Sequence, residues 1–262
     1  MKSLTEIKEK AQRNKRDKPF LLMFGYSIHR DISMHLTRTL LYLFPNIKPQ
    51  YVGFSMIFVG ILGSVLLFAF EVLAMGVVGF ILIYLSFLLD KVDGEISRFK
   101  EVFNVRGVFL DELYHILITP LLLVSVYYQY VKEIEWLLYT LLIAVYLVVA
   151  NRYNRKIPHL LYVKLQKRVR EHSLEDYQGS KVIKKIFNFV LFRLSSILER
   201  FDIILIVLFA AYLGEFYLEG SYLTYYLIGF TVLASIQFVR RSVLNYFGGA
   251  DYEVHRIETE GY

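Results

Sequence analysis

Six stretches of this sequence are apolar and long enough to cross a membrane as helices, which takes roughly 20 residues for about 30 Å of hydrocarbon. The expected spans are Tyr51–Phe70, Glu71–Leu89, Val108–Tyr130, Trp136–Ala150, Phe201–Phe216 and Tyr222–Phe238. The first two spans are nearly continuous, and Glu71 is the expected break between them. Hydrophobic residues make up 56% of the 262 residues although the formal net charge is +6. This combination favours a membrane protein with basic flanks over a soluble domain. The sequence therefore predicts an all-α integral membrane protein with six transmembrane helices.

An amphipathic helix is expected to precede the first span, over residues 26–44. Its apolar residues recur at helical spacing, with polar and basic residues between them. They are Ile28, Ile32, Leu36, Leu40 and Leu43, and the polar residues include His29, Arg30, His35, Thr37 and Arg38. This pattern is typical of a helix that lies in the membrane interface, with its histidines solvated. Pro45 and Pro49 would end it and turn the chain into the first span.

The remaining boundaries follow from composition. Residues 1–25 are expected to form a mobile polar N-terminus, residues 26–247 a membrane-embedded domain, and residues 248–262 a polar tail. No signal peptide is apparent, so the first span is expected to direct insertion. The sequence has no cysteine, which excludes disulfides and thiolate metal sites.

The distribution of positive charge predicts the orientation. With six spans, both termini, the loop around Arg98 and the segment 151–200 lie on one side, and every Lys and Arg except Lys132 falls on that side. By the positive-inside rule this side is cytoplasmic.

Segment 151–200 is a long basic insert with two charged runs, Lys164–Arg170 and Lys181–Lys185. We expect it to attract anionic membrane lipids rather than nucleic acid, because it adjoins spans on both sides. Asp202 at the start of the fifth span is expected to form a local ion pair with nearby Arg200.

Acidic residues mark the end of the second span and the start of the third. Asp90 and Asp93 are three apart, and Asp111 and His115 are four apart, so each pair shares a face of its helix. Carboxylates at membrane depth are costly and usually mark a metal, proton or substrate site. Two facing helices would direct these four side chains into one space, suited to a Mg²⁺ or Mn²⁺ ion and a diphosphate.

The sequence around these acids resembles the signature of the CDP-alcohol phosphotransferase family, D-x-x-D-G-x-x-A-R, eight residues, then G-x-x-x-D-x-x-x-D. The matching residues are Asp90, Asp93, Gly94, Arg98, Gly107 and Asp111, and the spacing between Arg98 and Gly107 is also that of the family. The resemblance extends to the six-span layout and the helix before the first span. It implies release of CMP from a CDP-linked donor, either CDP-diacylglycerol or a CDP-alcohol, when an alcohol acceptor attacks phosphorus. It also implies a homodimer.

The chain departs from this signature at two positions. Ser97 replaces the usual Ala, and His115 stands where the family has its fourth Asp, the residue generally taken to be the base that deprotonates the acceptor. A histidine suits proton transfer, because its ordinary pKa is near 6.5. Replacing an acid by neutral imidazole also lowers the negative charge, so we expect one metal ion, or two with one weakly held.

Each candidate residue has an expected role. Asp90, Asp93, Asp111 and His115 would hold the metal; Asp111 and His115 would also serve catalysis. Gly94, Ser97, Arg98 and Gly107 would bind the CDP moiety, with the glycines leaving room and Arg98 holding a phosphate by two hydrogen bonds. Arg155, Arg240 and Arg241 lie on the cytoplasmic side and are candidates for binding a phosphorylated acceptor.

Two other functions compete with this one. The first is a catalytically impaired member of the family that binds nucleotide or lipid without turnover, since His115 replaces an acid. The second is a cation transporter, whose ionisable residues would line several spans at different depths. Here they concentrate at one edge beside an arginine and two glycines, which favours a nucleotide site.

Overall fold

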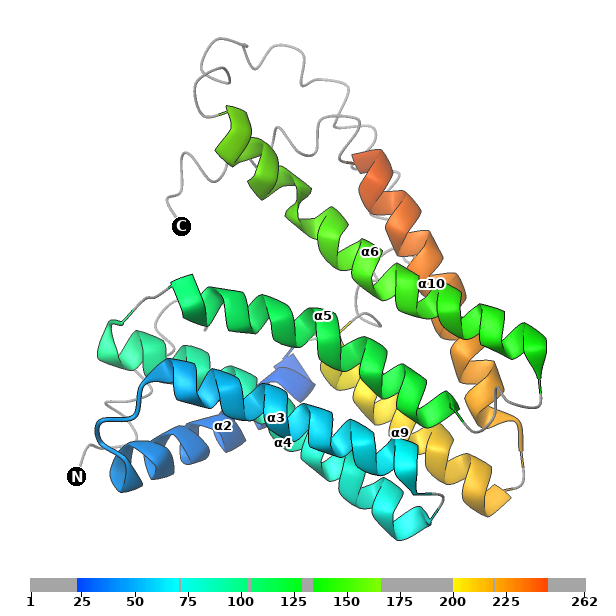
Figure 1. Ribbon diagram of the computed structural model, residues 1–262, viewed down its shortest axis with the longest axis horizontal. Coiled ribbons are helices and arrows are strands. Elements are labelled where there is room, and N and C mark those ends of the chain that lie inside the picture. Colours follow the sequence, from blue (N-terminus) through cyan, green and yellow to red (C-terminus); the bar gives the residue numbers. More distant parts are fainter. Residues whose placement is uncertain are drawn as a thin grey trace. The chain divides into compact units, whose positions relative to one another are not determined.

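The computed structural model describes residues 23–70, 72–102, 105–128, 134–165, 200–218 and 220–244 (Figure 1). These residues form seven α-helices and no strand, which confirms the prediction of an all-α protein. The helices are α2 (Met23–Leu43), α3 (Pro49–Ala69), α4 (Leu73–Lys100), α5 (Val105–Tyr127), α6 (Glu135–Leu165), α9 (Phe201–Leu218) and α10 (Tyr222–Leu244). Most of the predicted N-terminus, the basic insert beyond Leu165 and the predicted tail lie outside the described residues.

Six of the described helices, α3 to α6, α9 and α10, are long and apolar enough to cross a membrane. The six-span prediction is confirmed, and the chain is a multi-pass integral membrane protein. α3 ends at Ala69 and α4 begins at Leu73, so the first two spans are separated by a very short connection. Glu71, the predicted break, lies outside the described residues.

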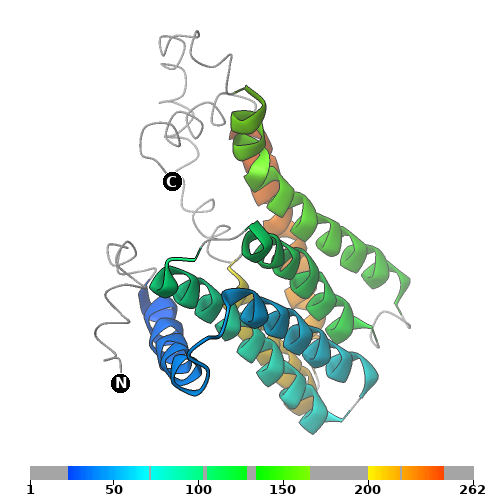
Figure 2. The ribbon, with the colours of Figure 1, turned by 60° about the vertical axis from the view of Figure 1, so that its left-hand side comes forward.

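The chain divides into two compact units, Met1–Tyr128 and Gln129–Tyr262. In the first unit, α3 packs against α4 and α5, and α2 packs against α4 (Figure 2). Glycine allows the closest of these approaches: a Cβ atom added at Gly63 of α3 would lie 2.7 Å from the backbone oxygen of Gly79 on α4. The Ser86 hydroxyl of α4 donates a hydrogen bond to the Met56 carbonyl of α3 at 2.5 Å, which satisfies a polar group inside this apolar contact.

α2 forms where a helix was predicted, but the predicted amphipathic character is not confirmed. Its buried face carries polar side chains, with His29 and Arg30 8% and 9% exposed and Ser33 and Thr37 fully buried. Ile32, expected on the lipid-facing apolar stripe, is 38% exposed. These four polar residues of α2 therefore pack against the protein, and the expectation of a solvated His29 is wrong, whereas His35 is exposed as expected. Its Nδ1 atom lies 2.9 Å from the Tyr84 hydroxyl of α4.

α4 runs without interruption through the first part of the acidic motif, from Asp90 to Arg98. It ends where Glu101 adopts a left-handed conformation with φ of 55°, and the Lys100 ammonium donates to the carbonyls of Pro45 and Ile47 at 2.7 and 2.6 Å. The connection between α2 and α3 is thereby attached to the end of α4. One continuous helix consequently carries Asp90, Asp93 and Arg98 in fixed angular positions.

In the second unit, α10 packs against α6 and also contacts α9 (Figure 1). The Asn151 side chain on α6 donates to the Ala234 carbonyl of α10 at 2.9 Å, and Asn154 donates to the Ser242 hydroxyl at 2.8 Å. These buried amides fix the register between the two helices. Trp136, the sole tryptophan of the sequence, stands near the start of α6 and is 51% exposed.

Candidate functional site

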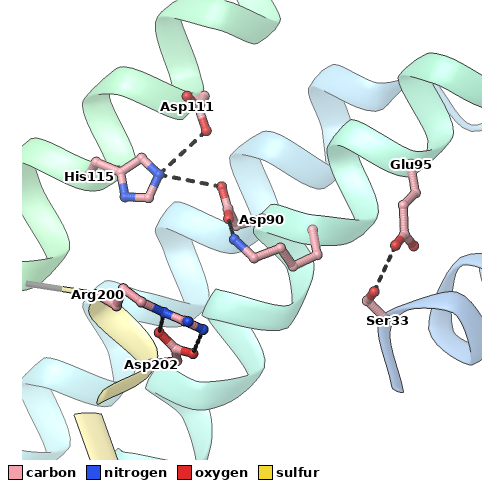
Figure 3. Close-up of polar contacts among 8 residues, drawn as sticks. Ser33, Asp90, Glu95, Asp111, His115, Arg200 and Asp202 are labelled. Atoms are coloured by element: carbon pink, nitrogen blue, oxygen red, sulfur yellow. Dashed lines mark hydrogen bonds and ion pairs between the residues drawn. The ribbon is translucent and has the colours of Figure 1, made fainter. Parts of the chain in front are cut away.

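Asp90 on α4 meets Asp111 and His115 on α5 in the first unit (Figure 3). Each of the three offers one donor atom, and these atoms all lie within 4.8 Å of one another. The Nε2 atom of His115 lies 3.8 Å from Oδ1 of Asp90 and 3.6 Å from Oδ1 of Asp111. The structure thus brings together three of the four residues predicted to hold a metal.

Local helix geometry accounts for this grouping. Asp111 and His115 are four residues apart on α5, so they stack one turn above the other and face α4 together. The three side chains differ in exposure: those of Asp90, His115 and Asp111 are 6%, 24% and 43% exposed. The group is therefore buried at Asp90 and open to a ligand at Asp111.

Asp93, the fourth predicted metal residue, lies one turn along α4 and points toward α3. A Cβ atom at Gly53 of α3 would stand 3.9 Å from its Oδ2 atom. Its Oδ1 atom is buried and has no hydrogen-bond partner among the described residues. Three residues rotate a helix by about 300°, so Asp90 and Asp93 diverge by about 60° rather than pointing in parallel.

Lys91 was not predicted to belong to the site, but its ammonium brings a positive charge to the group of Asp90, Asp111 and His115. Its ammonium lies 2.5 Å from Oδ2 of Asp90 and 4.5 Å from the ring centroid of Phe87. Asp90 therefore has Lys91 at one oxygen and His115 near the other. Lys91 directly follows Asp90, the first acid of the motif. This adjacency could have predicted the ion pair from the sequence.

Arg98 folds back over Gly94. A Cβ atom at position 94 would lie 3.1 Å from Nη1 of Arg98, so the absence of a side chain leaves space for the guanidinium beside the helix backbone. The two residues are four apart on α4, so they share a face of the helix. The Arg98 guanidinium therefore lies beside Gly94, the residue that follows Asp93. This arrangement suits an anionic ligand that approaches the helix closely.

Ser97 and Gly107 complete the predicted nucleotide residues. The Ser97 hydroxyl donates to the Val102 carbonyl at 2.6 Å and so stabilises the turn that ends α4. Apart from the chain neighbours and the backbone of its own helix, no atom of the described residues lies within 4 Å of a Cβ atom added at Gly107, which leaves space at the start of α5. The described residues thus give Ser97 a structural contact and leave Gly107 accessible.

The residues predicted to bind the acceptor belong to the second unit. Arg240 donates to the Gln237 side chain at 3.2 Å, and Arg241 donates to the Asn151 carbonyl at 3.2 Å. Arg155 falls within α6, and its side chain lies outside the described residues. Asp202 pairs with Arg200 at 2.5 Å, which confirms the predicted local ion pair (Figure 3).

Tyr114 is a further residue that the sequence analysis missed. It is fully buried directly before His115, and the two rings meet edge to face with centroids 5.1 Å apart. The tyrosine ring thus restricts the orientations open to the imidazole. No local pattern distinguishes it from the other aromatic residues of this apolar helix.

The residues present fit a hard divalent cation. Two carboxylates and an imidazole whose donor atoms lie within 4.8 Å of one another are suitable ligands for one Mg²⁺ or Mn²⁺ ion. The buried Oδ1 atom of Asp93 supports a charged ligand nearby, because a buried carboxylate oxygen without a partner is costly.

Comparisons with known proteins give no relative: no protein-family model matches the chain, and no curated protein matches it.

Proposed function

We propose that the chain is a metal-dependent CDP-alcohol phosphotransferase. The observation that carries this proposal is the meeting of Asp90, Asp111 and His115 from two neighbouring spans, with donor atoms within 4.8 Å of one another. Asp90 and Asp111 stand at positions where the signature of that family has acids, and His115 stands in place of its fourth Asp. A transporter would need ionisable residues along a path through the membrane, whereas these are gathered at one end of α4 and α5.

The reaction transfers a phosphatidyl or phospho-alcohol group from the CDP-linked donor. The acceptor hydroxyl oxygen attacks the phosphorus that bears the transferred group, the bond to the bridging oxygen breaks, and CMP leaves. A Mg²⁺ or Mn²⁺ ion would neutralise the charge that develops on the diphosphate. Carboxylate oxygens of Asp90, Asp93 and Asp111 would hold it, and the imidazole of His115 would lie beside it as the base.

His115 is positioned to accept the proton of the acceptor hydroxyl. Its side chain is 24% exposed, so a substrate can reach it, and Tyr114 limits the motion of its ring. An imidazole that is neutral near pH 7 can take this proton while the carboxylates keep their protonation state. Arg98, lying over Gly94, would hold a phosphate of the nucleotide.

The proposal includes an orientation and partners. The positive-inside rule places the end of α4 that carries the motif, and both termini, in the cytoplasm, where nucleotides are available. Arg155, Arg240 and Arg241 are the proposed contacts for a phosphorylated acceptor, and the active form is proposed to be a homodimer.

The test is CMP release by purified protein in lipid nanodiscs, with Mn²⁺ or Mg²⁺, CDP-diacylglycerol and a panel of alcohol acceptors. We expect CMP with at least one acceptor, and loss of metal-dependent CDP binding in Asp93→Asn. Asp31→Asn, which changes an exposed acid on α2, is the matched control. Metal-dependent CDP binding without CMP release across the panel would support the impaired, binding-only alternative. Unchanged CDP affinity in Asp93→Asn would contradict the proposed site.

A further inference from the structure

Glu95 is a buried acid that the proposed reaction does not use. It lies on α4 two residues after Asp93 and next to Gly94, and it is 1% exposed. A carboxylate at this depth inside a helix bundle is costly unless its oxygens are hydrogen-bonded. Its partners therefore indicate why it is there.

Both carboxylate oxygens of Glu95 accept hydrogen bonds from α2. The Ser33 hydroxyl donates to Oε1 at 2.8 Å (Figure 3), and the Thr37 hydroxyl donates to Oε2 at 2.7 Å. Ser33 and Thr37 are four residues apart and fully buried, so they form one face of α2. The acid thus binds two successive turns of a helix that is about 60 residues away in sequence.

Apolar contacts flank these hydrogen bonds. Met34 on α2 packs against Phe99 on α4, and both are buried. Leu36 and Leu40 of α2 pack against a buried cluster formed by Val92 and Ile96 of α4 and Val52 of α3. The buried contact between α2 and α4 therefore extends along the segment of α4 that carries Asp93, Gly94 and Arg98.

We propose that Glu95 is a positioning residue, which fixes α2 on α4 and thereby holds in place the segment of α4 that carries Asp90 and Asp93. This inference rests on the proposed metal site. Residues that orient ligands from outside the ligand shell are typically worth about 10–100-fold in metal affinity. Removing the two hydroxyl donors should loosen α2 and weaken metal binding together.

The experiment compares the full chain in nanodiscs with Ser33→Ala, Thr37→Val and their combination. Thr37→Ser, which keeps the hydroxyl, is the conservative rescue. Thr39→Val is the matched control, since Thr39 is exposed and its hydroxyl donates to the His35 carbonyl of its own helix. Mn²⁺ affinity is measured by electron paramagnetic resonance. Docking of α2 is measured by introducing Met34→Cys into each protein and following the rate of its thiol modification. The introduced thiol is the sole one, because the sequence has no cysteine.

We expect the dissociation constant for Mn²⁺ to rise at least about tenfold in the combined variant, with faster modification at position 34. Thr37→Ser and Thr39→Val should match the parent in both measurements. If the combined variant does not fold, the single variants Ser33→Ala and Thr37→Val should shift both measurements in the same direction.

Parent-like Mn²⁺ affinity in all hydroxyl-deleted variants would overturn the positioning role, whether or not α2 loosens. Failure of the proposed function would give another result, because the parent protein itself would not bind Mn²⁺. The modification rates would still report whether Glu95 holds α2.

Discussion

The imidazole Nε2 atom of His115 on α5 lies 3.8 Å from the carboxylate Oδ1 atom of Asp90 on α4. The two residues come from different spans and are separated by a loop, and they meet because α4 and α5 both pack against α3. Their contact is the centre of the proposed site.

Asp111→Asn should weaken cation binding, because the amide keeps the shape of the side chain and removes its charge. We expect the dissociation constant for Mn²⁺ to rise by at least about 100-fold, since even groups outside the ligand shell are worth 10–100-fold. Titration followed by electron paramagnetic resonance measures it, with Asp31→Asn as the control. Equal affinities of the two variants would show that Asp111 is not a ligand.

Lys91→Met should strengthen cation binding. The Lys91 ammonium lies on Oδ2 of Asp90, so it competes with a cation for that oxygen. A partly exposed ion pair is worth about 1 kcal/mol, which corresponds to roughly a fivefold gain in Mn²⁺ affinity. Lys48→Met, which changes an exposed lysine before α3, should have no effect. A loss of affinity in Lys91→Met would mean that the lysine supports Asp90 instead of competing at it.

His115→Ala should slow CMP release by about 10²–10⁴-fold if the imidazole is the general base. His115→Asp supplies the carboxylate found in the family signature and should retain or raise activity. His35→Ala, on an exposed histidine of α2, is the control. Initial rates at saturating substrate separate this effect from binding, and a fully active alanine variant would exclude the base role.

Gly63→Ala should destabilise the first unit. The new methyl group would lie 2.7 Å from the Gly79 carbonyl oxygen, and backbone cannot move aside as a flexible side chain can. Overpacking of this kind costs about 1–3 kcal/mol. Thermal unfolding in detergent should show a lower midpoint than for Gly229→Ala, where no atom lies within 4 Å of the added Cβ. Equal midpoints would mean that α3 and α4 can separate without cost.

The membrane architecture was predictable because it depends on local composition. Each span is a run of apolar residues, and hydrogen bonding within a helix satisfies its backbone in lipid. The pair Asp111 and His115 was equally predictable, since four residues form one helical turn. The ion pair of Arg200 with Asp202 followed from their adjacency in sequence.

The packing of α2 was not predictable from its own residues. His29, Arg30, Ser33 and Thr37 form a polar stripe that is typical of a solvated face, yet the structure buries all four. Glu95, which receives two of these side chains, is about 60 residues away, and no local pattern links the two segments. The direction of Asp93 toward Gly53 likewise depends on how α3 packs. Asp93 therefore does not point at the same place as Asp90 and Asp111, although its spacing predicted that it would.

The sole tryptophan, Trp136 near the start of α6, gives the protein an intrinsic optical probe. Because its indole is half exposed, brominated acyl chains in the surrounding bilayer can quench its fluorescence. The depth of the quenching bromine then measures how far the beginning of this span lies from the bilayer centre, with no label attached to the chain.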